Sequence, residues 1–214
     1  MTFEQVYDIL QQDVNYPKLL KPILKYLDKS KTTLDAGCGS GYILKYLVSQ
    51  GYPMVGLDIN KDMLKLAQEK LEKENLSCEL IKHDIRKKIP RKFDQIISLL
   101  DVSHYFMGVK KVFHNYYQAL NPNGILILDL YRLPIFEEEE GIYQGLSYHW
   151  EVYTTKAQIV HELEVSKDGL TQKFKVKQWY NEIEYYEAIL LSLGFKVKII
   201  KSFDDRKVFL ICKK

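Results

Sequence analysis

Short apolar runs alternate with helical periodicities along the first 130 residues of the chain. Between the runs, apolar residues recur at helical spacing, most clearly at Val109, Val112, Phe113, Tyr116 and Leu120. Apolar runs that alternate with helices are typical of a parallel sheet covered on both faces. The pattern predicts a doubly wound α/β domain with strands at 32–37, 52–58, 77–84, 93–100 and 124–130.

The pattern changes after residue 133. Residues 134–145 include four consecutive glutamates, Glu137 to Glu140, and are predicted to be a solvated loop rather than a cation-binding segment. Three segments then alternate with period two, and the sequence Lys-Asp-Gly at 167–169 predicts a hairpin turn between the last two. We expect a small antiparallel insertion over 134–180, with its strands near 146–154, 157–166 and 171–180.

The chain then returns to the main domain. Asn181 is a predicted helix N-cap with Glu184 at the capping-box position, and Gly194 ends the helix. Two apolar segments, 195–203 and 207–214, predict an antiparallel hairpin. The predicted division is a main domain of residues 1–133 and 181–214, interrupted by the insertion.

Composition narrows the class of protein. The chain has 214 residues, of which 46% are hydrophobic and 28% charged, as in an ordinary globular domain. A net charge of +3 with dispersed lysines does not favour nucleic-acid binding. Three cysteines without a CxxC pair favour a reducing compartment and no structural zinc. Without a signal-like or membrane-length apolar segment, we expect a cytoplasmic protein with no metal and no membrane partner.

Glycines alternate in the sequence LDAGCGSGY at 34–42. A dinucleotide-binding GxGxxG motif would need a glycine where Tyr42 stands. Asp35 lies two residues before Gly37, where a carboxylate would repel a pyrophosphate but attract an ammonium group. The amides after Gly39 begin a helix and can bind a carboxylate. The motif therefore favours a ligand with an amino-acid head group.

Acidic residues also end the next two predicted strands. Asp58 can accept hydrogen bonds from the two hydroxyls of a ribose. Asp84 and Ile85 can contact the amino group and the ring face of an adenine. An amino acid, a ribose and an adenine together describe S-adenosylmethionine, which is the predicted cofactor.

The chain resembles the class I methyltransferases that depend on S-adenosylmethionine. The resemblance rests on five motifs in order: LDAGCGSG, VGLDIN, HDI, FDQIISLLDVSHYF and LNPNGILILDL. It implies a mostly parallel seven-stranded, Rossmann-like sheet that ends with one antiparallel strand. It also implies that the cofactor contacts Gly37, Cys38, Gly39, Ile59, Met63 and Leu100 in addition to the residues named above.

A narrower resemblance is to small-molecule methyltransferases, including sugar N-methyltransferases, through the N-terminal sequence VYDILQQDVNYPKLLKPIL. It implies that Tyr7 and Tyr16 close over the cofactor. It also implies that the insertion at 134–180 is a substrate lid. Trp150, Trp179 and Tyr180 can then line a substrate cavity or form the core of the insertion.

The segment after the fourth predicted strand supplies the candidate acceptor-side groups. Asp101 and His104 are the candidate catalytic bases, although His104 can equally anchor the start of the loop. Tyr105, Tyr131 and Arg132 are candidate substrate-binding residues, and Arg132 can instead form a surface ion pair.

These features predict a methyltransferase that transfers a methyl group to nitrogen or oxygen of a small molecule by in-line displacement. An RNA or protein methyltransferase is an alternative, although LDVSHY is unlike the Asn-Pro-Pro-Tyr motif of such enzymes. A third hypothesis is a non-catalytic protein that binds S-adenosylmethionine or S-adenosylhomocysteine. The sequence leaves monomer and homodimer open.

Overall fold

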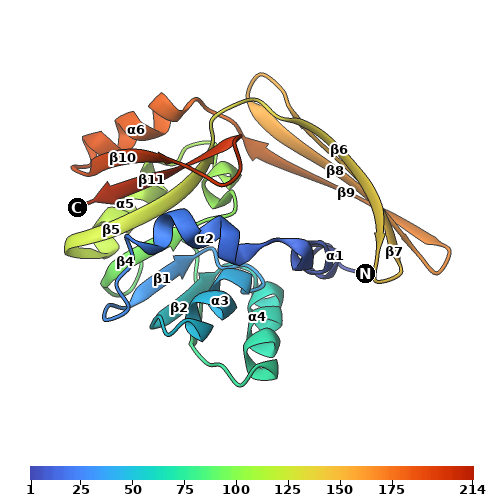
Figure 1. Ribbon diagram of the computed structural model, residues 1–214. Helices are drawn as coiled ribbons and strands as arrows, with labels where there is room; N and C mark the ends of the chain where they lie inside the picture. The colour runs from blue at the N-terminus through green and yellow to red at the C-terminus, as the bar shows by residue number, and fades with distance from the viewer.

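A seven-stranded sheet forms the centre of the computed structural model, which describes residues 1–214 (Figure 1). The strand order is β10-β11-β5-β4-β1-β2-β3. Neighbours from β5 to β3 pair in parallel, whereas β11 is antiparallel to both β5 and β10. The predicted doubly wound fold is confirmed, with strands β1 (Thr33–Ala36), β2 (Met54–Asp58), β3 (Glu79–Lys82), β4 (Phe93–Ser98), β5 (Leu120–Tyr131), β10 (Lys196–Lys201) and β11 (Lys207–Lys213).

Helices cover both faces of this sheet because its strands are apolar on both sides. In β5, Leu126, Leu128 and Leu130 pack with residues of α5 and α6, while Ile127 packs with residues of α2 and α3 on the other face. Each fully buried leucine contributes about 1.5–3 kcal/mol of transfer free energy. The helices are α2 (Tyr16–Leu24), α3 (Tyr42–Ser49), α4 (Lys61–Lys73), α5 (Lys110–Ala119) and α6 (Ile183–Ser192).

Two helix starts differ in how they are capped. Asn60 is the N-cap of α4 and its side chain accepts hydrogen bonds from the amides of Asp62 and Met63. The prediction that Asn181 caps α6 is wrong, since the helix begins one residue later, after Glu182. The amide of Tyr180 is still bonded to the carbonyl of Ala157, which keeps the chain in the preceding strand hairpin at that point.

A second, four-stranded antiparallel sheet extends from one end of the main sheet (Figure 1). Its order is β6-β7-β8-β9. The prediction of a loop at 134–145 is wrong, because Phe136–Tyr143 forms the edge strand β6 and pairs with β7 along its whole length. The other strands of this sheet are β7 (Leu146–Thr154), β8 (Gln158–Lys167) and β9 (Leu170–Trp179).

The glutamates of β6 are compatible with a strand because three of their four carboxylates have side-chain partners. His149 contacts Glu138 at 2.8 Å, Tyr148 donates to Glu139 at 2.7 Å, and Glu137 pairs with Arg206. Charged side chains on an edge strand also discourage pairing with another chain. Cross-strand contacts therefore offset the low strand propensity of glutamate.

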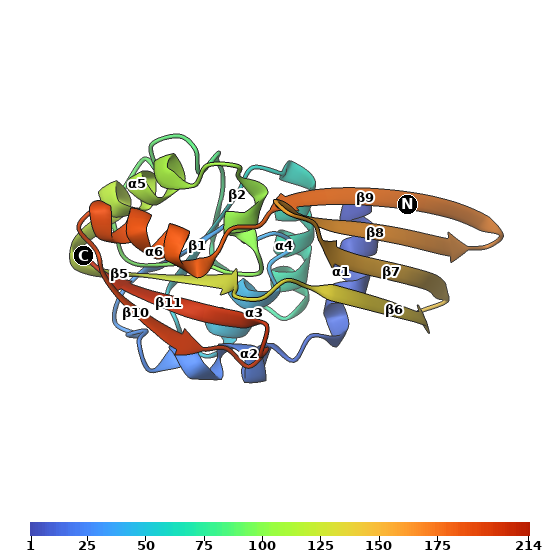
Figure 2. The same ribbon diagram turned by 90° about the horizontal axis from the view of Figure 1, so that it is seen from above.

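Helix α1 (Phe3–Leu10) lies between the two sheets (Figure 2). Its start is closed by a capping box between Thr2 and Gln5. Val6 is fully buried and packs with Leu146, Leu163 and Val165 of the antiparallel sheet. No helix in the structure has the length and apolar character needed to cross a membrane.

Candidate active site

A cavity of about 410 Å³ opens at the carboxyl ends of β1, β2 and β4. The residues predicted to bind the cofactor all line it, and Tyr105 lines it as well. Those residues are Tyr7, Tyr16, Asp35, Gly37, Cys38, Gly39, Asp58, Ile59, Met63, Asp84, Ile85 and Leu100. The wall also contains Phe3, Glu4 and Gln11 from the N-terminal segment, which the sequence did not identify as binding residues.

The alternate glycines between β1 and α3 meet two different needs. All three adopt left-handed backbone conformations, with φ of 87° at Gly37, 53° at Gly39 and 82° at Gly41. A Cβ on Gly37 would lie 2.7 Å from Val102, and one on Gly41 would lie 2.7 Å from Ala67. A Cβ on Gly39 would meet nothing within 4 Å. Two glycines therefore permit protein packing, while Gly39 leaves its backbone open to the cavity.

Alanine substitutions should separate these two roles. We expect Gly41→Ala to lower the melting temperature by about 4 °C or more, because the new methyl collides with α4 in addition to the backbone strain. Gly39→Ala should lower it less and should instead weaken binding of S-adenosylhomocysteine. Differential scanning fluorimetry measures the melting temperatures of both variants, and calorimetry measures their affinities. If the two variants lost the same stability and the same affinity, Gly39 and Gly41 would not have separate roles.

Asp35 is a buried carboxyl group at the end of β1. It is 2% exposed, and its Oδ2 atom has no hydrogen-bond partner. Burial, together with the nearby charge of Asp58, raises the pKa of Asp35 to about 8. The side chain is therefore an acid without a counterion on the cavity wall, which is an environment that favours a cationic ligand group.

Asp58 organises the loop that faces it. Its Oδ2 accepts a hydrogen bond from the amide of Gly39 at 2.9 Å, and its Oδ1 accepts one from the amide of Asn60 at 2.8 Å. The side-chain amide of Asn60 donates to Glu4 of α1 at 2.9 Å. Asp58 thus connects the glycine loop to the start of α4, and through Asn60 to the N-terminal helix.

Replacement of Asp58 should reduce cofactor affinity. We expect Asp58→Ala to weaken binding of S-adenosylmethionine by about 10- to 100-fold, since hydrogen bonds to a charged acceptor are each worth about 1.5–3 kcal/mol. The measurement is titration calorimetry, with Asp62→Ala as the control because Asp62 is exposed on α4 and does not line the cavity. Unchanged affinity in the Asp58 variant would remove Asp58 from the cofactor site.

The side chain of Asp84 already has a partner. Both of its oxygens accept hydrogen bonds from the Arg86 guanidinium, at 2.9 Å and 2.8 Å. This pairing lowers the pKa of Asp84. Arg86 and His83 line the cavity beside it, and His83 Nε2 is buried without a partner. An adenine at this position would meet a carboxylate that is shared with an arginine.

Aromatic rings of the N-terminal segment form the other wall. The ring of Tyr16 stacks on that of Tyr42 with a centroid distance of 5.2 Å and an interplanar angle of 3°. The Tyr42 hydroxyl donates to the carbonyl of Asp8 at 3.0 Å, and Lys70 forms an ion pair with Asp8 at 2.9 Å. These contacts fasten the segment that carries Tyr7 over the cavity.

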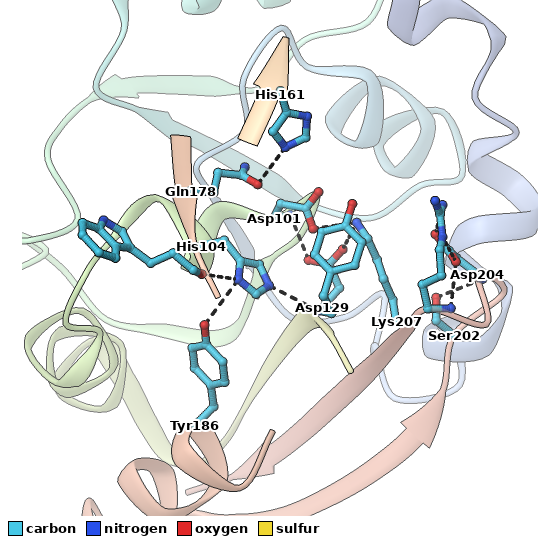
Figure 3. Close-up of polar contacts among 12 residues, drawn as sticks. Asp101, His104, Asp129, His161, Gln178, Tyr186, Ser202, Asp204 and Lys207 are labelled. Atoms are coloured by element: carbon cyan, nitrogen blue, oxygen red, sulfur yellow. Dashed lines mark hydrogen bonds and ion pairs between the residues drawn. The ribbon is translucent and has the colours of Figure 1, made fainter. Parts of the chain in front are cut away.

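The two candidate bases are not among the residues that line the cavity. Both have structural partners (Figure 3). Asp101 forms an ion pair of 2.6 Å with Lys207, and its amide donates to Asp129 at 3.2 Å. Burial opposes ionisation of Asp101, but Lys207 holds its pKa below the ordinary value. His104 is fully buried, and its two ring nitrogens contact the carbonyl of Trp179 at 2.8 Å and the amide of Tyr131 at 3.2 Å.

The three candidate substrate-binding residues lie in different places relative to the cavity. Tyr105 is half exposed and lies on the cavity wall. Tyr131 is buried outside the lining, with Lys207 Nζ 4.4 Å from the centre of its ring. Arg132 is exposed, and its Nε donates to the carbonyl of Asp205 at 2.8 Å. The structure therefore brings only Tyr105 of these three to the cavity.

Residues 27–186 match the family model of a methyltransferase domain. The chain belongs to this family. An uncharacterized methyltransferase of Alkaliphilus oremlandii is 26% identical to this methyltransferase over 188 residues, which cover 86% of this chain and 76% of the relative. The sequence prediction of a class I methyltransferase that uses S-adenosylmethionine is confirmed.

Solved structures show the same fold. An S-adenosylmethionine-dependent methyltransferase from Clostridium acetobutylicum superposes with a TM-score of 0.80 at 20% identity, covering 99% of this methyltransferase and 97% of that chain. CalS10, an amino pentose methyltransferase from Micromonospora echinaspora solved with S-adenosylmethionine bound, gives 0.79 at 17% identity, with coverage of 100% and 98%.

The residues around the cavity fit S-adenosylmethionine, the cofactor of this methyltransferase. The unpartnered oxygen of Asp35 suits the ammonium group, and the open backbone at Gly39 allows close approach of the amino-acid part. Asp58 also lines the cavity, and it would accept hydrogen bonds from the ribose hydroxyls. When bound, the cofactor supplies a methyl group on a positively charged sulfur, which is activated for displacement.

Proposed function

We propose that this methyltransferase transfers the methyl group to an amine nitrogen of a small molecule. The observation that carries the proposal is that both side chains best placed as bases are already engaged. Asp101 is paired with Lys207, and both ring nitrogens of His104 have main-chain partners. An amine can lose its proton to water before it attacks, whereas a hydroxyl group needs a base at the site.

The surroundings of the cavity support a small acceptor. Helix α1 lines the cavity through Phe3 and Tyr7, and its Phe3 ring lies 5.6 Å from that of Phe174 in the antiparallel sheet. The sheet and the helix therefore stand together beside the cavity. Tyrosine rings such as Tyr7 and Tyr105 suit an ammonium or a methylated amine, since aromatic faces attract cations. CalS10, with a similar fold, acts on an amino pentose.

The residues of the site would act mainly by positioning. Holding an acceptor nitrogen in line with the methyl group and away from water supplies up to about 7–11 kcal/mol in favourable intramolecular cases. Tyr7, Leu100 and Tyr105 form the wall that would orient the acceptor, and Asp35 and Asp58 would fix the cofactor. The paired charges of Asp101 and Lys207 stay in place throughout.

The test is a screen of matched acceptors with isotope-labelled S-adenosylmethionine. Each amino sugar or alkylamine is paired with the corresponding hydroxyl compound, and RNA and a mixed protein extract are included. We expect label on nitrogen, located by fragmentation mass spectrometry. Label on oxygen only, or on RNA or protein only, would overturn the proposal. Binding of S-adenosylmethionine without turnover of any acceptor would count against it as well.

A further inference from the structure

The antiparallel sheet joins the main sheet through two connections at one end, as both ribbon views show (Figures 1 and 2). β5 ends at Tyr131 and continues through residues 132–135 into β6. β9 ends at Trp179 and continues through residues 180–182 into α6. The strands β5, β6 and β9 and the helix α6 that flank these connections are hydrogen-bonded and stiff. A movement of the β6–β9 sheet relative to the cavity would therefore bend the two connections.

His104 contacts the chain at the start of both connections (Figure 3). The amide of Tyr131 can only donate, so His104 Nε2 accepts its hydrogen bond at 3.2 Å. His104 Nδ1 therefore carries the ring proton and donates it to the carbonyl of Trp179 at 2.8 Å. One imidazole thus binds a donor on one connection and an acceptor on the other.

The same histidine belongs to an element that forms part of the cavity wall. It lies in the short 3-10 helix η2 (Val102–Tyr105), whose residues Val102 and Tyr105 line the cavity. Its ring packs against that of Tyr131 at 5.4 Å and that of Tyr186 at 5.7 Å. The Tyr186 hydroxyl of α6 also lies 3.3 Å from Nδ1. His104 therefore sits where the cavity wall, the sheet connections and α6 meet.

Burial keeps this imidazole neutral. Burial lowers the pKa of His104, against the opposing influence of the Asp101 carboxylate. Asp129, Lys207, His161 and the phenols of Tyr131 and Tyr186 are the other ionisable groups nearby. Only the neutral ring offers one donor and one acceptor. A protonated ring would direct a second N–H at the amide of Tyr131 and break that hydrogen bond.

We propose that His104 is a positioning residue that fastens both connections of the β6–β9 sheet to the cavity wall and holds the sheet over the acceptor. The inference rests on the proposed function, because it places a small acceptor beside this sheet. It assigns His104 to the geometry of the site and not to proton removal from the acceptor. Protonation of the ring at acid pH breaks the hydrogen bond to the amide of Tyr131 and so frees the first connection.

Three substitutions of His104 test its two hydrogen bonds separately. The side-chain amide of His104→Asn reaches only the position of Nδ1 and can still donate to Trp179. That of His104→Gln reaches the position of Nε2 and can still accept from Tyr131. His104→Phe fills the space and makes neither hydrogen bond. The chain contains two tryptophans, Trp150 and Trp179, both in this sheet, so fluorescence reports on it directly.

The experiment measures hydrogen exchange at the Tyr131 amide and over residues 180–182, corrected for intrinsic exchange at each pH. Calorimetry with S-adenosylhomocysteine confirms that each variant is folded around its cofactor site. We expect His104→Phe to speed exchange at both connections by about tenfold, since each connection loses one buried hydrogen bond. His104→Gln should keep the wild-type protection from exchange only at Tyr131. His104→Asn should keep it only over residues 180–182. In the wild type, exchange at Tyr131 and the tryptophan fluorescence should both change at acid pH, and His104→Phe should remove this change.

Exchange at Tyr131 within about twofold of wild type in His104→Phe would overturn the proposal. A loss of kcat with unchanged exchange would do so too, since it would indicate that His104 acts on the acceptor itself. The exchange results are independent of the acceptor screen. If no amine is labelled in the screen but the exchange results are as expected, the proposed amine acceptor is wrong. The positioning role of His104 is then still supported.

Discussion

Asp35→Asn is expected to weaken binding of S-adenosylmethionine by about 100-fold, since it removes a charge-assisted hydrogen bond in a buried site. The substituted side-chain amide would keep the shape of the carboxyl group but could not become an anion. The unpartnered Oδ2 of Asp35 is the feature that makes this group the expected counterion of the cofactor ammonium. Titration calorimetry at pH 8 measures the loss, with Asp62→Asn on the exposed side of α4 as the control.

The same carboxyl group should make wild-type affinity depend on pH. The pKa of Asp35 is raised to about 8, so below that pH the ligand-free group is mostly protonated and must lose a proton to pair with an ammonium. Affinity should fall by about tenfold for each pH unit below about 8. Above pH 8 it should fall again, because the α-ammonium of the ligand has an ordinary pKa of about 8. A flat profile between pH 6 and 8 would contradict the role of Asp35.

Stability without ligand should change in the opposite direction. A carboxyl group whose pKa is raised on folding stabilises the protein below its unfolded pKa of about 4, and this stabilisation is lost as the pH rises towards the folded value of about 8. The asparagine of the Asp35→Asn variant does not ionise, so the variant does not lose this stabilisation as the pH rises. In urea unfolding without cofactor, the variant should therefore gain stability relative to wild type between pH 4 and 8. Parallel pH profiles for the two proteins would show that the pKa of Asp35 is not raised.

The cofactor side of the site can be predicted from the sequence because the positions of its residues depend on local sequence patterns. Asp35, Asp58 and Asp84 each end or follow a parallel strand, and such ends meet at one edge of a sheet. The apolar runs fix which strands are parallel, so the three positions can be placed together without knowledge of any side-chain contact. The glycine loop follows in the same way, although two of its glycines serve packing against Val102 and Ala67.

The other side of the site depends on contacts between distant segments, which a local pattern does not contain. Lys207 pairs with Asp101 across 106 positions of sequence, and Trp179 meets His104 across 75. The sequence could place His104 after β4, but it left open whether the ring faces the cavity or anchors the loop. Strand β6 was hidden for a similar reason, because its glutamates are tolerated only through partners on β7 and through Arg206.

A strained turn follows β4, and a buried ion pair holds it in place. Leu100 and Asp101 both have left-handed backbones, with φ of 59° and 69°, which costs about 1–2 kcal/mol for each non-glycine residue. Lys207 Nζ lies 2.6 Å from Asp101 and 3.4 Å from Asp129, and its side chain is 11% exposed. Burial opposes the charge on Lys207, but the two carboxylates hold its pKa above the ordinary value.

Lys207→Met should therefore lower the free energy of unfolding by about 3–5 kcal/mol, because it leaves two buried carboxylates without their counterion. The loss should shrink as the pH falls from 8 to 4, since removal of the ammonium raises the pKa of Asp101 and lets the carboxyl group become neutral. Urea unfolding measures both effects.

Two further variants make this test specific to the ion pair. Lys213→Met changes an exposed lysine on the same strand, β11, and should alter stability by no more than about 0.5 kcal/mol. Adding Asp101→Asn to Lys207→Met should recover much of the lost stability, because it removes one of the stranded charges. If the double variant were as unstable as Lys207→Met alone, the loss would come from packing of the lysine stem, and the turn at Leu100 and Asp101 would be held by other contacts.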